Sequence, residues 1–433
     1  MGQPGRPMDQ PFEHLFRRES GRITATVARI FGVHNLALAQ DVVQEAFCRA
    51  LEIWPFRGIP ENPSAWLMLT AKNCALDVLR RERTARDYAP ELSNILHSEW
   101  TLAPAVEELF APQEIKDDLL RMMFSCCPPR VPELAQVALI LHVLCGFSVE
   151  EIAGAFVSGH AAIEKRIARG KSLLAQSRRL FDVSTAEVFA TRLPAVQRAL
   201  YLLFNEGYHG ASPKAAVRAE LCGEAIRLTA LLLQHPFGAT PSTYALAALM
   251  ALNSARLPAR LNASGNLVAL ADQDRSQWDW QRVAEGMKLL ELSSPGWPMG
   301  FLPGTALSAY HIEAAIAAIH ASARHTEATD WRTIVSLYDV LMTLTPSPVV
   351  ALNRAIAIAQ VDGPERGLTE IQAIVDRDRL STYPFYLATL GELELRRGQP
   401  ARARTHFEAA LERTRSPMER RFIEQRIHAC ERT

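Results

Sequence analysis

The sequence has little that would support a secreted, membrane-spanning or zinc-binding protein. Its seven cysteines are odd in number and include no C-x-x-C pair, so neither a disulfide framework nor a zinc knuckle is indicated. The longest apolar run, Val137 to Cys145, is interrupted by His142 and falls far short of the ~20 residues that a membrane span needs. No signal peptide is recognisable. We therefore expect a cytoplasmic protein, in which Cys126 and Cys127 are small buried residues rather than a redox pair.

The sequence also has no motif of a common enzyme class, since it contains no P-loop, GxGxxG, HExxH or nucleophile elbow. His311, His320 and His325 invite a metal site, but the first two lie nine residues apart and no acidic residue follows at the fourth position. We therefore interpret these histidines as packed or surface residues. The sequence predicts no enzyme, no cofactor and no metal site.

The charges balance, with 47 basic and 47 acidic residues, and a net charge of zero by itself argues against a nucleic-acid partner. The basic residues are segregated, however. Four arginines face one acid between Arg80 and Arg86, and six basic residues face one acid between Gly159 and Leu180. The acidic stretch from Asp87 to Asp118 lies between them and contains three prolines that break any long helix. This charge pattern predicts two basic surfaces joined by an acidic tether.

Apolar positions recur at helical spacing along almost the whole chain, which predicts an all-α protein, and a length of 433 residues predicts two or three domains. In the first block we expect a helix from Leu36 to Trp54. Asn62 is the expected N-cap of the next helix, with Pro63 at its first position. The expected core face of the first helix consists of Val43, Ala46, Phe47, Ala50, Leu51 and Trp54.

The second block has the pattern of a helix-turn-helix. Ser148 and Glu151 have the spacing of a capping box, and residues 157–159 form the expected turn. In the following helix the apolar positions Ile163, Ile167 and Leu174 predict one buried face, which leaves the basic residues on the other. A short capped helix followed by a cationic helix is typical of a major-groove reader. The alternative is an ordinary helical hairpin with a solvated basic face.

These motifs resemble the extracytoplasmic-function group of bacterial RNA polymerase sigma factors. Residues 41–47 resemble the D-x-x-Q-E-x-F stretch of region two, and Trp66 to Arg81 resembles the helix that follows it. Residues 151–153 and 166–169 resemble the E-I-A and R-[LI]-x-R parts of the region-four helix-turn-helix. Order and spacing both match.

The resemblance implies three sets of site residues. The face that binds core polymerase contains Asp41, Gln44 and Glu45. The candidates for contact with the melted −10 element are Trp66, Lys72, Asn73, Asp77, Arg80 and Arg81, and core packing is an equally good interpretation of Trp66. The −35 element is read by His160, Lys165, Arg166 and Arg169, and about four phosphate contacts predict a log-log salt slope of roughly −4. Glu164, where the family often carries a lysine, leaves the preferred promoter sequence open.

Residues 184–433 are far more than a small sigma factor needs, and they contain a tetratricopeptide-like pattern. One repeat has Leu390, Gly391, Ala403, Phe407 and Ala410, and an earlier one has Ala351, Ala355, Gly367, Ile371 and Ile374. Small residues at these positions let paired helices approach closely. Residues 202–208, 272–276 and 314–321 also resemble a sigma subgroup with such an extension, which implies that the extension replaces a separate anti-sigma protein. We interpret Asp272, Asp274 and Arg275 as an ion-pair cluster.

We therefore expect region two at residues 10–86, an acidic flexible linker at 87–116, region four at 117–183 and a helical-repeat extension at 184–433. The predicted function is that of a sigma factor that binds core RNA polymerase and promoter DNA and directs transcription initiation. Its extension would control it, through a protein partner or an intramolecular contact. One alternative is a DNA-binding regulator with a ligand- or peptide-sensing repeat domain, which has no use for the 41–47 helix. A second is a repeat scaffold whose basic helices are incidental.

Overall fold

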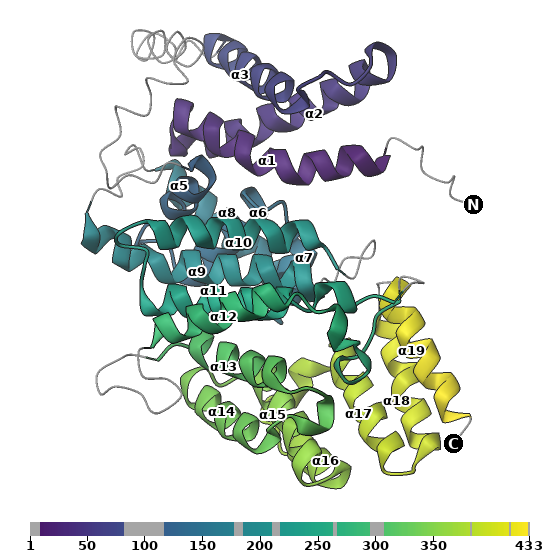
Figure 1. Ribbon diagram of the computed structural model, residues 1–433. Helices are drawn as coiled ribbons and strands as arrows, with labels where there is room; N and C mark the ends of the chain where they lie inside the picture. The colour runs from purple at the N-terminus through teal and green to yellow at the C-terminus, as the bar shows by residue number, and fades with distance from the viewer. Residues whose placement is uncertain are drawn as a thin grey trace. The chain divides into compact units, whose positions relative to one another are not determined.

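The structure, a computed structural model, describes residues 9–81, 117–176, 185–209, 217–262, 266–294, 307–381, 383–414 and 417–431. Within these ranges the chain is helical, and the extended backbone amounts to one isolated bridge between Leu261 and Leu267 (Figure 1). The predicted all-α class is confirmed. The linker predicted at 87–116 lies outside the described residues, as does the predicted boundary at residue 183.

The chain forms two compact units. Unit 1 contains the residues up to Ala199 together with His235–Phe237, and unit 2 contains Leu200–Gln234 and Gly238–Thr433. The division falls inside one continuous helix, α9 (Ala186–His209). The beginning of the predicted extension therefore belongs structurally to the unit that holds the predicted DNA readers.

The first part of unit 1 consists of α1 (Asp9–Phe31), η1 (Val33–Asn35), α2 (Leu36–Arg57) and α3 (Pro63–Arg81). Both predicted helices are confirmed, and the Asn62 side chain accepts a hydrogen bond of 3.0 Å from the backbone N–H of Ala65, as expected of an N-cap. The predicted core face of α2 is buried except at Leu51, which is 52% exposed. The prediction for Leu51 is wrong, because this residue lies at the edge of the apolar face of α2, whereas Ala50 and Trp54 on the same face are buried in the core.

The second part of unit 1 consists of α5 (Asp118–Ser125), α6 (Glu133–Val143), α7 (Val149–Ala155) and α8 (His160–Ala175). The capping box is confirmed, with Ser148 and Glu151 each accepting a backbone N–H of the other at 3.1 and 2.8 Å. Val157 adopts a φ of +46° in the turn before α8. The apolar positions predicted for α8 are buried, which confirms its inner face. The exposed fractions are 0% for Ile163, 6% for Ile167 and 1% for Leu174.

Cys126 and Cys127, which follow α5, are buried, as predicted. Burial raises the pKa of the Cys126 thiol to about 12. Because the thiolate is the reactive form of cysteine, neither residue has the character of a redox centre.

The two parts of unit 1 pack against each other through α1. Asp118 at the start of α5 accepts a hydrogen bond from Thr26 at 3.1 Å and pairs with Arg29 at 3.3 Å. Gly21 lies against the backbone after α6, so closely that a Cβ at this position would be 1.9 Å from the carbonyl oxygen of Leu144. Only glycine allows this approach without a shift of the backbone.

The start of α9 packs against α5 through aromatic rings. The Phe189 ring centroid lies 4.4 Å from that of Phe124 and 4.5 Å from that of His235, with which it is stacked at 7°. Arg192 donates a hydrogen bond of 3.1 Å to the carbonyl of Phe124. Phe124 and Phe189 are both fully buried. We call these four residues the α5–α9 seam.

Unit 2 continues with helical pairs, and its later helices carry the repeat pattern. Its further α-helices are α10 (Ala219–Gln234), α11 (Pro241–Ser254), α12 (Trp280–Ser293), α13 (Ala309–Ser322), α14 (Trp331–Leu344), α15 (Pro348–Val361), α16 (Pro364–Gln372), α17 (Pro384–Arg396), α18 (Pro400–Arg413) and α19 (Pro417–Cys430). Its short 3-10 helices are η3 (Leu257–Ala259), η4 (Leu270–Asp272), η5 (Arg275–Gln277), η6 (Thr326–Ala328) and η7 (Arg377–Leu380).

The small residues of the predicted repeats lie where the helices cross. A Cβ on Gly391 of α17 would be 2.7 Å from the ring of Phe407 on α18. In the earlier repeat, a Cβ on Gly367 of α16 would be 2.5 Å from the Cβ of Ala359 on α15. The predicted helical-repeat arrangement is thereby confirmed in both places.

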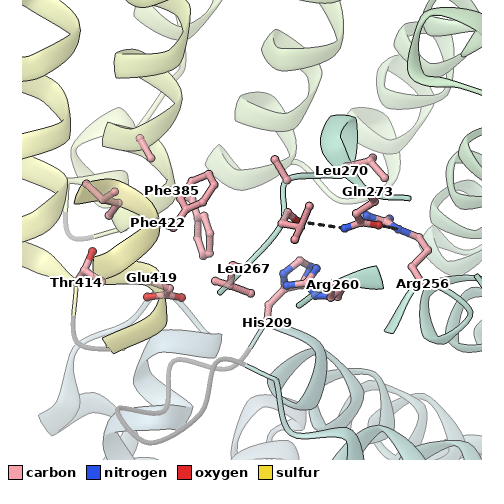
Figure 2. Close-up of a pocket in the computed structure, with 14 residues that line it drawn as sticks. His209, Arg256, Arg260, Leu267, Leu270, Gln273, Phe385, Thr414, Glu419 and Phe422 are labelled. Atoms are coloured by element: carbon pink, nitrogen blue, oxygen red, sulfur yellow. Dashed lines mark hydrogen bonds between the residues drawn. The ribbon is translucent and has the colours of Figure 1, made fainter. Parts of the chain in front are cut away.

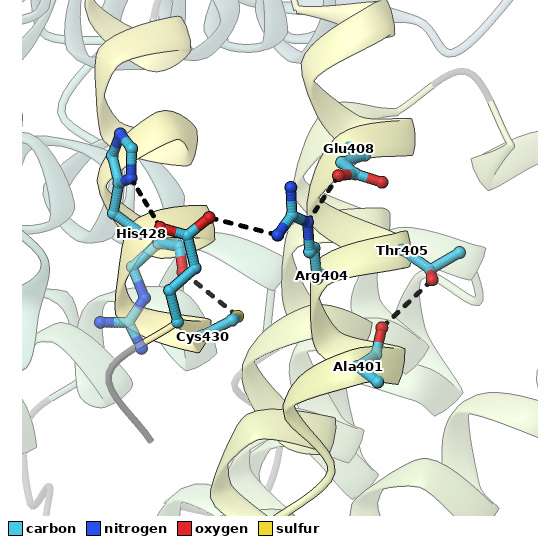
Figure 3. Close-up of polar contacts among 8 residues, drawn as sticks. Ala401, Arg404, Thr405, Glu408, His428 and Cys430 are labelled. Carbon is cyan, nitrogen blue, oxygen red and sulfur yellow. Dashed lines mark hydrogen bonds and ion pairs between the residues drawn. The ribbon is translucent and has the colours of Figure 1, made fainter.

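Surface ion pairs add to the last repeat (Figure 3). Arg404 on α18 donates hydrogen bonds to Glu408 at 2.8 Å and to Glu431 at 3.2 Å, and His428 lies 3.3 Å from Glu431. Exposed pairs of this kind contribute only about 0–1 kcal/mol each. The burial of Phe407 and its apolar neighbours therefore dominates the stability of this part of the protein.

The three further segments that resemble the sigma subgroup meet in unit 2. Tyr201, beside the first segment, donates a hydrogen bond of 2.9 Å to Glu313, beside the third. Arg275 in the second donates to the carbonyls of His320 and Ala323 at the end of α13, at 2.7 and 2.5 Å. Asp274 instead accepts from Ser276. The ion-pair interpretation of residues 272–275 is wrong, because adjacent side chains point to different partners.

Glu313 predicts a pH dependence of stability. Burial raises the pKa of this carboxyl from 4.5 to about 7, against the opposing effect of the Tyr201 hydrogen bond. The contribution of neutral Glu313 is present in full below pH 4.5 and is lost as the pH rises through 7, a change of about 3 kcal/mol. We expect Glu313→Gln to gain stability relative to the wild type by about this amount between pH 4.5 and pH 8.

The measurement is denaturant unfolding of both proteins across this pH range. His209 and His320 titrate in both proteins, so their effects cancel in the difference. A difference between the two proteins that does not change with pH would contradict the prediction.

Candidate nucleic-acid and polymerase interface

The outer face of α8 is basic and open to solvent. His160, Lys165 and Arg169 are exposed and Arg166 is half-buried, while Ile163 and Ile167 fix the opposite face in the core. The structure therefore places all four predicted −35 residues on α8, with Lys165 and Arg169 on its solvent side, Arg166 at the edge of that side and His160 in the first turn. Such a helix, held by a capped partner and a tight turn, has the form that enters a major groove.

Glu164 has a structural partner on this face. Its carboxylate lies 3.7 Å from Nδ1 of His160, one turn earlier, and both side chains are exposed. A contact of this kind holds the histidine only weakly, since exposed pairs are screened by solvent. Glu164 thus remains available to accept a hydrogen bond from a base.

The inner edge of α8 approaches the first part of unit 1. Lys171 is half-buried, and burial lowers its pKa while the charge of Asp41 on α2 opposes that shift. The helix also packs against η1. The predicted −35 reader and the predicted polymerase-binding helix are therefore neighbours in unit 1.

The outer face of α2 carries the three predicted polymerase-binding residues. Asp41, Gln44 and Glu45 are exposed, and Glu45 accepts a hydrogen bond of 2.9 Å from Arg49 one turn later. Buried apolar residues alternate with them and hold the helix in the core. This arrangement presents a polar, mainly acidic strip to solvent.

The predicted −10 residues on α3 are not equally accessible. Asn73 and Asp77 are exposed, but Lys72 is only 8% exposed. Trp66 is half-buried, with its ring 5.5 Å from that of Trp54, so it contributes to the core and also reaches the surface. Arg80 and Arg81 belong to α3, and their side chains lie outside the described residues.

Sequence reasoning missed an apolar surface at the end of α2. Phe56 is 90% exposed, and Ile59 and Leu51 are 55% and 52% exposed. An aromatic ring left in water beside a turn commonly marks a contact surface. The available signal was Gly58, which ends α2 with a φ of +82° beside Phe56 and Ile59, whereas Pro55 lies inside the helix.

Taken together, these helices define a DNA-binding transcription protein. Residues 15–85 match the family model of sigma-70 region 2, and residues 192–294 match a family of unknown function, DUF6596. RNA polymerase sigma factor CarQ of Myxococcus xanthus is 33% identical over 144 residues, which cover 33% of this chain and 74% of CarQ. The chain belongs to the sigma factors of RNA polymerase, of the extracytoplasmic-function type, with a C-terminal extension, and its role lies in transcription initiation.

The likeness also extends over nearly the whole length of another protein. An uncharacterised protein of Rhizobium meliloti is 38% identical over 410 residues, which cover 94% of this chain and 93% of that protein. No solved structure matches the chain. Membership of the family implies binding to core RNA polymerase and promoter DNA, which favours the predicted sigma factor over a DNA-binding regulator without polymerase affinity. Among the described helices, none is long and apolar enough to cross a membrane.

Proposed function

We propose that the chain reads a promoter at two sites, the −35 element with α8 and the −10 element with α3 and the end of α2, while the outer face of α2 binds core polymerase. The observation that carries this proposal is the exposed basic face of α8 on a capped helix-turn-helix. Lys165 and Arg169 would hold phosphates, while Arg166 and Glu164 would read base edges.

The exposed residues of α3 and the neighbouring turn suit a melted strand. Phe56 offers a ring on which a base can stack, a contact worth about 1–3 kcal/mol per base. Asn73 and Asp77 offer hydrogen-bonding groups from the same part of unit 1. Lys72 has no such role in this arrangement, since its side chain is buried.

The extension is part of this proposal because of the α5–α9 seam. Phe189 comes from the extension, yet it completes the core around Phe124 of α5. Without it, the ring of Phe124 would lose its neighbours and the region-four helices would lose part of their support. We therefore propose that the extension is required for activity and does not act as a detachable inhibitor.

Weakening the seam tests this role. We expect Phe189→Ala to lower promoter-directed run-off transcription with core polymerase by about tenfold or more, because removing a buried phenylalanine costs about 3–5 kcal/mol of stability. The matched control is Leu292→Ala, since Leu292 is 50% exposed and lies on α12 in unit 2. Circular dichroism reports whether each variant is folded. Transcription above the wild-type level for Phe189→Ala would mean that the extension inhibits.

A further inference from the structure

Unit 2 contains a cavity of about 240 Å³ with two chemically different ends (Figure 2). One end is formed by His209 at the end of α9 and by Arg256 and Arg260 around η3. The other is formed by side chains of α17 and α19, and the segment before Gln273 runs between the two. The cavity thus combines residues that are far apart in the chain.

Among the described residues, no carboxylate pairs with the arginine end. Arg256 donates a hydrogen bond of 3.4 Å to the side chain of Gln273, and the Arg260 guanidinium lies 4.2 Å from the centre of the Tyr208 ring. In the part of the chain that the structure describes, no ion pair joins either guanidinium to a carboxylate. Burial lowers the pKa of Arg256, and the charges of Arg260 and Arg275 lower it further. Half-buried like charges of this kind are costly unless an anion compensates them.

The guanidinium of Arg260 has a donor without an acceptor among the described residues. Its Nε is buried and has no hydrogen-bond partner among the described residues. A buried N–H without an acceptor costs about 1–3 kcal/mol, so such groups are uncommon in folded proteins. Arg260 also lines the cavity, where the other N–H groups of its guanidinium could donate to a ligand oxygen.

His209 adds an uncharged donor to the same end. The residue is exposed and lines the cavity. Protein atoms around the ring, followed by the charges of Arg260 and Arg256, lower its pKa. The ring is therefore neutral at physiological pH, and one of its nitrogens carries a proton that it can donate.

The far end is mainly apolar. It is lined by Leu267, Leu270, Phe385, Phe422 and Ile423, together with Ala388. Glu419 and Thr414 lie on this side, away from the arginines (Figure 2), and burial raises the pKa of Glu419 to about 7. The negative charge of Glu419 is therefore partly suppressed and is kept apart from the cationic end.

We propose that this cavity binds a small amphipathic anion, with its carboxylate or phosphate head between Arg256 and Arg260 and its apolar body against Phe385, Phe422 and Ile423. Planar guanidinium groups match both kinds of head. An apolar cavity of about 150 Å³ holds benzene, so a space of this size suits a ligand on the order of ten heavy atoms. The test of this site measures ligand binding and not transcription. Its outcome is therefore independent of the role proposed above for the extension.

The test is isothermal titration calorimetry of the full chain with octanoate and hexyl phosphate, which carry the two candidate heads on similar bodies. The anion that binds more tightly identifies which head group, carboxylate or phosphate, the site prefers. We expect at least one of them to bind at least about tenfold more tightly than either 1-octanol, which lacks the charge, or acetate, which lacks the body. Arg260→Gln should weaken that binding at least about tenfold, a change of about 1.4 kcal/mol.

Two further variants separate binding from folding. Ala388→Phe fills the apolar end and leaves the arginines in place, so it should also weaken binding at least about tenfold. Arg402→Gln changes an exposed arginine on α18 outside the cavity and should bind as the wild type does. Thermal unfolding checks that each variant is folded. Absence of saturable binding of both anions, equal binding of 1-octanol, or unchanged binding in folded Arg260→Gln would overturn the proposal.

Discussion

Replacing Lys165 and Arg169 of α8 together by glutamate is expected to lower the affinity for a −35 duplex by about 100-fold. Each residue is exposed on the basic face, and the loss of one good contact costs roughly 1.4 kcal/mol or more, which is about a factor of ten. The log-log salt slope should become less steep by about two, because two phosphate contacts disappear. Titration of labelled duplex at several salt concentrations measures both quantities.

The control for this double variant has the same change of charge elsewhere. Lys288→Glu on α12 together with Arg402→Glu on α18 alters two exposed basic residues in unit 2. It should leave both the affinity and the slope within about twofold of the wild type, because neither residue belongs to the α8 face that would hold phosphates. If the two double variants bound DNA equally, α8 would not be the reader.

Gln44→Ala combined with Glu45→Arg is expected to abolish the pull-down of core polymerase. The change reverses the charge in the middle of the exposed strip of α2. Its cost to folding is small, because the Glu45–Arg49 pair that it removes is exposed and such pairs contribute about 0–1 kcal/mol. The loss therefore reports the interface and not the stability of region two.

Glu61→Arg is the matched control, since Glu61 is exposed in the turn before α3 and lies outside the α2 strip. We expect this variant to retain core binding. If the α2 double variant also retained core binding, and its binding to −35 DNA were unchanged, the polymerase face would have to lie elsewhere on the protein.

Several local features of the fold could be predicted from neighbouring residues alone. The capping box at Ser148 and Glu151 and the N-cap at Asn62 depend on contacts within one turn of a helix, and both are confirmed. The buried faces of α8 and α18 follow from spacing, because residues three and four apart share one side of a helix. The repeat pattern predicted that small residues lie where paired helices approach closely, as Gly391 does against Phe407.

The errors and omissions concern surfaces that depend on what another helix covers. Leu51 has the spacing of a core residue but lies at the uncovered edge of α2, while Phe56 is left in solvent beyond it. Lys72 has the charge of a DNA contact but is buried. Periodicity indicates which side chains share a face, and it does not indicate how wide the packed area on that face is.

The helix-turn-helix, the region-two helices and the repeats were determined by the sequence itself, because capping and apolar spacing act over one or two turns. Only the tertiary structure decided that Arg29 and Asp118 join the two parts of unit 1, that Phe189 from the predicted extension completes the core around Phe124, and that Arg256 and Arg260 share a cavity. A −10 and a −35 element lie about 25 base pairs apart, or about 85 Å at 3.4 Å per pair. A chain that reads both elements at once therefore has to break the contact between Arg29 and Asp118. Such contacts join residues far apart in the chain, and their existence depends on how complete helices pack, which no local pattern encodes.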